Sequence, residues 1–199
     1  MRQRYTRICV ALLLLVALVG KVLLDASGDP PETPLPEAMP CAGRSVYLDD
    51  LTPTAQHVGY GDGVGTHGQL GFEGRSVVVR GVPYAHALSM HPPPSTKGEA
   101  YATFNLQGSA HQTFSASVAI NDNNNFFGRA GSDLYFSVLA DDGRVIWTST
   151  KGIRKTGVVE RAIEIDIASV RGLRLTVRAE GSNSCAHAVF LDPVVCTSE

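Results

Sequence analysis

The segment LYFSVLADDGRVIWT, residues 134–148, determines the fold class of this chain. Leu134, Phe136 and Val138 alternate with Tyr135 and Ser137. This period of two predicts a strand with one face in a core and the other in water. The following Asp-Asp-Gly, residues 141–143, predicts a tight hairpin in which the glycine takes a positive φ, and a second strand is expected over residues 144–148.

The same period of two continues along most of the chain. It recurs in residues 100–106, 114–120, 163–167 and 173–178. Shorter strand candidates are residues 45–51, 76–80, 87–91 and 188–195. About ten short strands joined by glycine-rich connections, with no pattern for an internal helix, predict an all-β, two-sheet antiparallel β-sandwich or jelly roll.

Composition limits the classes of function. The chain has 199 residues, enough for one domain, and 44% of them are hydrophobic while 18% are charged. Such values are ordinary for a globular core and argue against disorder. The formal net charge of −2 gives no basic excess. We therefore expect no nucleic-acid partner.

The N-terminus carries a targeting signal. Arg2, Arg4 and Arg7 precede an apolar run over residues 8–24 that is interrupted only by Gly20 and Lys21. A basic start followed by an apolar helix of this length is typical of a secretory signal, and it also reaches the lower limit for a membrane span. Residues 1–28 are therefore expected to be a signal peptide or a signal anchor, and either one makes the remainder secreted or membrane-anchored, outside the cytoplasm.

A proline-rich spacer follows over residues 29–40. Five prolines in this segment favour an extended, solvated chain. The folded domain is then expected over residues 41–196. The spacer holds this domain away from a membrane or simply separates it from the signal peptide.

The cysteines allow one disulfide in the domain. Cys9 lies in the apolar segment, which leaves Cys41, Cys185 and Cys196. Cys185 and Cys196 are too far apart to bond if they share one extended strand. We therefore predict a Cys41–Cys196 disulfide that joins the two ends of the domain. The alternative is three buried thiols, which an oxidising compartment makes less favourable.

Several short motifs follow one another through the expected domain. They are Val46-Tyr47-Leu48-Asp49-Asp50-Leu51-Thr52-Pro53, Gly59-Tyr60-Gly61, Gly81-Val82-Pro83-Tyr84 followed by Leu88-Ser89-Met90-His91, the segment 114–122, Phe136-Ser137-Val138 with Asp142-Gly143, and His187-Ala188-Val189-Phe190-Leu191-Asp192. In this order they resemble the NPCBM family of carbohydrate-binding modules over nearly all of residues 45–195. Tyr60 and Phe190 stand where that family has tryptophan.

The resemblance implies a galactose-binding-like β-sandwich of the kind found on secreted glycan-active proteins. It implies a glycan as the ligand and no catalytic activity. A structural calcium ion is implied by the resemblance only. Carboxylates that could serve as its oxygen ligands are Asp49, Asp50, Asp122 and Asp133.

Sugar recognition requires an aromatic face for the ring and polar groups for its hydroxyls. The segment 121–127 supplies amides, a carboxylate and two phenylalanines. The alternative is a turn stabilised by its own asparagines, with the phenylalanines in the core. Tyr60 is expected to stack on a sugar from a glycine-rich stretch. The predicted carbohydrate-binding residues are Tyr60, His91, Asn121, Asp122, Asn123 and His187.

His91 and His187 are included because they fall in family motifs and because a neutral imidazole both donates and accepts hydrogen bonds. The alternative is a core histidine whose nitrogens bind the backbone. His86 and His91 are five residues apart on an expected strand, so they should face opposite sides. No zinc site is predicted. Trp147 is expected to pack in the core.

Three classes of function remain. The first is a non-catalytic carbohydrate-binding module for galactose-type or related glycans. The second is a protein-interaction or adhesion domain on the same scaffold, which the replacement of both tryptophans favours and which predicts an exposed apolar patch. The third is an enzyme, which the lack of a Gly-x-Ser-x-Gly elbow or any other catalytic motif disfavours.

Overall fold

The structure is a computed structural model that describes residues 41–197, except residues 42, 73, 108–109 and 123–127. The expected signal peptide or anchor, its apolar helix and the proline-rich spacer all lie outside the described residues. Within the described part of the chain, no helix is long and apolar enough to cross a membrane. The regular structure of the described residues is β, as predicted, apart from two short 3₁₀ turns at Leu48–Asp50 and Ser95–Lys97.

The first sheet is built around the last strand of the chain. Its order is β1-β13-β7-β11, and β5 also pairs with β13. All of its pairs are antiparallel. The bounds are Ser45–Tyr47 for β1, Ala87–Met90 for β5, His111–Ile120 for β7, Val159–Asp166 for β11 and Ala188–Thr197 for β13.

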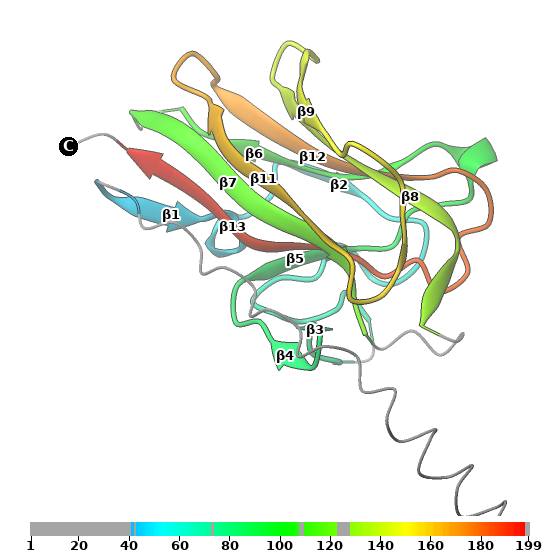
Figure 1. Ribbon diagram of the computed structural model, residues 1–199. Helices are drawn as coiled ribbons and strands as arrows, with labels where there is room; N and C mark the ends of the chain where they lie inside the picture. The colour runs from blue at the N-terminus through cyan, green and yellow to red at the C-terminus, as the bar shows by residue number, and fades with distance from the viewer. Residues whose placement is uncertain (1–40, 42, 73, 108–109, 123–127, 198–199) are drawn as a thin grey trace, which may run out of the picture. The chain divides into compact units, whose positions relative to one another are not determined.

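The second sheet has the order β10-β8-β12-β6-β2, and β9 also pairs with β8. The two sheets lie face to face (Figure 1). The small hairpin of β3 (Val78–Val79) and β4 (Val82–Pro83) lies apart from both sheets. In the second sheet the bounds are Ala55–His57 for β2, Ala100–Asn105 for β6, Arg129–Ala140 for β8, Val145–Thr148 for β9, Ile153–Lys155 for β10 and Gly172–Ala179 for β12.

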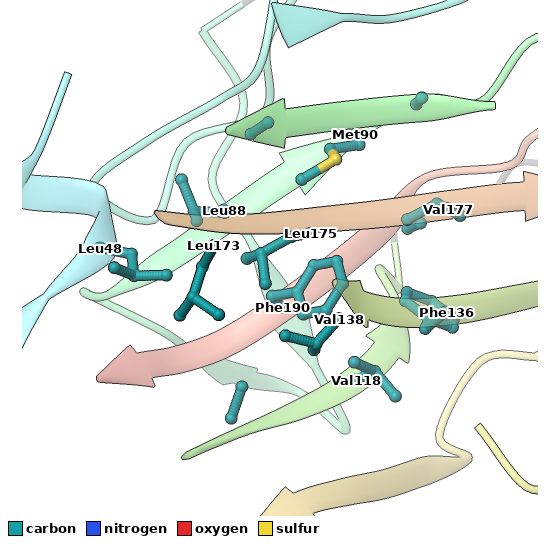
Figure 2. Packing of buried hydrophobic residues seen from close by; sticks show 14 of the residues in the cluster. Leu48, Leu88, Met90, Val118, Phe136, Val138, Leu173, Leu175, Val177 and Phe190 are labelled. Atoms are coloured by element: carbon teal, nitrogen blue, oxygen red, sulfur yellow. The ribbon is translucent and has the colours of Figure 1, made fainter. Parts of the chain in front are cut away.

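The alternating side chains of the sequence fill the space between the sheets. On β8, Leu134, Phe136 and Val138 are fully buried, while Tyr135 and Ser137 are only half-buried. Side chains from β8, β12 and β13 meet in this core (Figure 2). Phe136 contacts Phe190 of the opposite sheet edge to face, with ring centroids 5.5 Å apart. Burial of this apolar surface stabilises the sandwich, and the period of two is what directs it inward.

The hairpin predicted at residues 141–143 is confirmed. It joins β8 to β9, and Gly143 has a φ of 84°. Asp142 accepts a hydrogen bond from the Arg144 amide at 2.9 Å, which stabilises the turn. Trp147 of β9 pairs with Val138 and packs against the core while half-buried, in line with the expected packing role.

The strand predictions fail where burial does not alternate. The first strand ends at Tyr47 rather than Leu51, because the next residues turn into the 3₁₀ segment. Only Val78–Val79 of the expected strand at 76–80 forms a ladder. The strand β2 was not predicted, because all three of its residues are exposed. Such a strand is held by backbone pairing to β6 rather than by a buried face.

The two ends of the domain are joined as predicted. Cys41 and Cys196 form a disulfide with their Cα atoms 5.5 Å apart. Ser45 pairs with Cys196 in the first sheet, and the Arg44 amide donates to Thr197 Oγ1 at 3.0 Å. The alternative of three buried thiols is therefore wrong. Cys185 carries no disulfide.

Candidate functional site

Two histidines meet where β5 ends and β13 begins. Met90 pairs with Ala188, so His91 and His187 occupy the next opposed positions of the same antiparallel pair. Opposed residues of an antiparallel pair project on the same face. The two rings accordingly stand 5.2 Å apart, edge to face. Strand register therefore joins two motifs that lie almost a hundred residues apart in the chain.

A glycine-rich segment, residues 59–72, brings two aromatic rings to these histidines; it is called the site loop below. Tyr60 lies 5.4 Å from His91 and Phe72 lies 4.9 Å from His187, measured between ring centroids. Tyr60 and Phe72 also contact each other at 5.4 Å. The four rings form a closed cycle of contacts.

Close backbone contact with β5 holds the site loop in place. The Gly65 amide donates to Ser89 O at 3.0 Å, and the Ser89 amide donates back to Gly65 O at 2.9 Å. A Cβ at Gly65 would collide with Gln69 O and Ser89 Oγ, so this position requires glycine. The glycines of the site loop thus serve tight packing, and that packing sets the position of Tyr60 and Phe72.

Asp49 ties the site loop to the sandwich. Its side chain is completely buried. Its Oδ2 accepts hydrogen bonds from the His67 amide at 3.2 Å and from the Ala87 amide at 3.1 Å. The same carboxylate therefore binds both the site loop and the first residue of β5. This gives the aspartate in the 3₁₀ turn after the first strand a structural role.

The four rings border a small hollow that opens to solvent. Gly63, Gly71, Ser89 and Met90 also line it, and its volume is about 10 Å³. This is room for roughly one water molecule. Tyr60 remains 54% exposed at the rim. The hollow can accept one hydroxyl-sized group while a larger ring lies outside against Tyr60.

The hydrogen bond of His91 determines its tautomer. Its Nδ1 lies 3.2 Å from Pro92 O, and a carbonyl oxygen only accepts, so Nδ1 carries the proton. Burial lowers the pKa of His91, against a smaller opposing effect of this hydrogen bond. The ring is therefore neutral at pH 7, and its Nε2 is an acceptor.

The pKa of His187 is lowered to about 4, chiefly by burial and to a smaller extent by the nearby His91 and Arg75. Its Nδ1 is buried without a hydrogen-bond partner among the described residues. A buried N–H without a partner is more costly than a buried lone pair, which assigns the proton to Nε2. His91 and His187 therefore offer one acceptor and one donor, the pair that a single hydroxyl needs.

The structure brings together three of the six predicted site residues, Tyr60, His91 and His187. Asn121 and Asp122 follow β7, and the backbone amide of Asn121 donates to His187 O at 2.9 Å. Their side chains have another role. Asn121 Oδ1 accepts from the Val78 amide at 2.6 Å, and Asp122 Oδ2 accepts from the Gly81 amide at 2.7 Å.

Asn121 and Asp122 thus brace the β3–β4 hairpin, a segment distant in sequence, which is neither the predicted sugar contact nor the alternative of a turn stabilised by its own asparagines. Asn123 lies outside the described residues, as do the two phenylalanines after it.

Phe72 is the site residue that the sequence prediction missed. One feature of the sequence could have identified Phe72. It is an aromatic residue that follows Gly71 at the end of the glycine-rich stretch that holds Tyr60. Phe190 stands at one of the two positions where the NPCBM family has tryptophan. Its side chain is fully buried in the core. The loss of tryptophan at that position therefore leaves the four rings unchanged.

The calcium ligands suggested by resemblance do not assemble. Among the described residues, only Asp49 and Asp50 come together, with His86 as the third member. Asp49 already accepts two backbone hydrogen bonds, and its Oδ1 faces His86 Nδ1 at 3.3 Å. Calcium takes six to eight oxygen ligands. This donor set does not fit calcium.

Similarity to solved structures supports the fold. A structure of CBM51 from Clostridium perfringens GH95 in complex with methyl-galactose is 21% identical, with a TM-score of 0.60, over 76% of this chain and 99% of that one. The tandem CBM51 modules of Sp3GH98 from Streptococcus pneumoniae are 18% identical, with a TM-score of 0.63, over 86% of this chain and 52% of that one.

A third structure holds similar modules beside an enzyme. It contains the M60 catalytic domain with the CBM51-1 and CBM51-2 domains of Clostridium perfringens ZmpB, at 24% identity and a TM-score of 0.64. The match covers 79% of this chain but 16% of that one. No curated protein matches the chain. The NPCBM/NEW2 domain family matches residues 44–195, which is most of the chain, and the protein belongs to that family.

Proposed function

We propose that this protein is a non-catalytic carbohydrate-binding module for galactose-type or related glycans. The observation that carries the proposal is the hollow bordered by Tyr60, Phe72, His91 and His187, with one acceptor and one donor nitrogen beside an exposed aromatic ring. A sugar ring would lie on Tyr60 and place one hydroxyl between the histidines. Membership of the family and the CBM51 fold support this assignment.

The adhesion alternative requires a continuous exposed apolar patch. Among the described residues, the exposed large apolar side chains are Tyr60, Val82 and Val145. They belong to the site loop, β4 and β9, three separate segments. Single exposed apolar residues are normal on any protein surface. This distribution gives no support to the alternative.

We propose further that the domain is exported, with residues 1–28 as signal peptide or anchor and residues 29–40 as its spacer. The Cys41–Cys196 disulfide supports export, because disulfides persist in oxidising compartments. Expression of the full chain in bacteria followed by fractionation and thiol labelling tests this. Recovery of a cytoplasmic protein with reactive Cys41 and Cys196 would refute export.

Isothermal titration calorimetry tests the binding proposal. Methyl-galactoside should bind the wild type, and Tyr60→Ala should weaken the binding by about tenfold through loss of the stacking face. Val145→Ala is the matched control, because Val145 is exposed to a similar degree, at 56%, on β9, which does not line the hollow. Absence of binding across galactose, N-acetylgalactosamine and related glycans would refute the proposal.

A further inference from the structure

A second and larger depression adjoins the hollow; it is called the loop groove below. It is lined by Gln56 and by residues of the site loop and just beyond it, and has a volume of about 560 Å³. Gly63, Leu70, Gly71 and Phe72 line both the hollow and the loop groove. The two spaces therefore adjoin along these shared residues.

Size distinguishes the two spaces. The loop groove is a shallow depression, wide open to solvent, with a volume of about 560 Å³. The hollow has room for about one hydroxyl. A single sugar bound at the hollow would leave the loop groove empty. A ligand that fills both must be longer than one ring.

The side chains of the loop groove suit hydroxyl groups. Gln56 Oε1 accepts from the Val64 amide at 3.0 Å, which fixes the side chain and leaves its NH₂ group as a donor. Asp62 is exposed, and within the described part of the chain its carboxylate has no hydrogen-bond partner; its amide alone is bound, to Gly71 O at 2.9 Å. Thr66 and Gln69 add further polar groups.

Charge selects the class of glycan. The described lining of the loop groove contains the carboxylate of Asp62, no lysine or arginine, and one imidazole, that of His67, whose Nε2 lies 3.4 Å from Asp50 Oδ1. An anionic sugar would meet the negative charge of Asp62 without a lysine or arginine of the described lining to offset it. Neutral sugars instead offer hydroxyl donors to the carboxylate, and such charge-assisted hydrogen bonds are the stronger kind.

We propose that the loop groove binds the inner residues of a neutral oligosaccharide whose terminal residue occupies the hollow, with Asp62 as a specificity-determining residue. This inference rests on the proposed function, because the hollow must hold the terminal sugar. Phe72 lies between the two spaces and presents an aromatic wall to adjoining sugar residues.

Calorimetry with a matched ligand series tests the inference. The ligands are methyl-galactoside, a neutral galactose-terminated trisaccharide and the same trisaccharide carrying a sialic acid on an inner residue. The neutral trisaccharide should bind about tenfold more tightly than the monosaccharide, and the sialylated form should lose this gain. Asp62→Ala should lower the affinity for the neutral trisaccharide and leave that for methyl-galactoside unchanged.

Asp142→Ala is the control, because Asp142 is another exposed carboxylate, on the β8–β9 hairpin, that does not line the loop groove. Thermal unfolding of both variants confirms that they are folded. Equal affinity of the wild type for monosaccharide and neutral trisaccharide overturns the inference and leaves the proposed function intact. So does an unchanged trisaccharide affinity in Asp62→Ala. Absence of binding by every ligand of the series overturns both.

Discussion

The core of the sandwich and the site loop are held together by different means. In the core, apolar side chains at every second position of β6, β8, β12 and β13 pack between two sheets. In the site loop, glycine backbone lies against β5, and Asp49 binds one of its amides. Burial of a repeating pattern therefore builds this fold, whereas a few individual contacts position its candidate binding residues. The two regions should respond differently to substitution.

The largest loss of stability is expected in the core. Phe190→Ala removes a fully buried ring that contacts Phe136 across the sandwich. The free energy of unfolding should fall by about 3–5 kcal/mol. Urea denaturation followed by tryptophan fluorescence measures this, since Trp147 packs against the same core. A loss below about 1 kcal/mol would mean that the two sheets are not packed as described.

Removal of the disulfide should have the next largest effect. The double variant Cys41→Ser, Cys196→Ser frees a loop with a sequence separation of 155 residues. The free energy of unfolding should decrease by about 3 kcal/mol, chiefly because the unfolded chain gains freedom. Cys185→Ser is the control and should cost much less, since that residue closes no loop. An equal effect of both variants would contradict a stabilising role for the disulfide.

The contact between the site loop and the sandwich should be sensitive to substitution of Asp49. Asp49→Ala removes the buried acceptor of the His67 and Ala87 amides, at a cost of about 2–3 kcal/mol. Amide hydrogen exchange should accelerate in the site loop more than in β8 and β12. Asp50→Ala, which changes an exposed neighbour, is the control. Uniform acceleration over the whole domain would show that Asp49 acts on global stability alone.

Acid should lower the free energy of unfolding through protonation of His187. Its folded pKa of about 4 lies below the ordinary value of 6.5, so between these values the unfolded state binds a proton that the folded state does not. This contribution to stability is complete above pH 6.5 and falls as the pH drops towards 4. With allowance for solvent screening the loss is about 2 kcal/mol. Denaturation at pH 7 and pH 4 measures it, and His187→Gln should show a smaller loss. An equal loss in both proteins would exclude His187 as the cause.

The sequence predicts more of the core than of the site. The alternation around Phe136 predicted a two-sheet sandwich, because burial in a sheet has a period that sequence displays directly. The cysteine spacing predicted the Cys41–Cys196 disulfide through strand length. The exposed strand β2 has no such period and was missed.

The site depends on contacts between distant segments. His91 and His187 were predicted from separate motifs, and strand register, which sequence alone does not give, brings them together. Phe72 was missed because its place depends on how tightly glycines pack against β5. Asn121 and Asp122 were predicted as sugar ligands, but their oxygens accept hydrogen bonds from the β3–β4 hairpin. A polar loop can bind a ligand or its own backbone, and composition alone does not distinguish the two.

The most direct test of the central claim is nitrogen NMR of the histidine rings during titration with methyl-galactoside. The ring nitrogens of His91 and His187 should shift as the sugar is added and reach a plateau at saturation. His111, a buried histidine at the start of β7, should stay unchanged. Saturable binding that leaves the rings of His91 and His187 unshifted would contradict the assignment of the hollow as the sugar site.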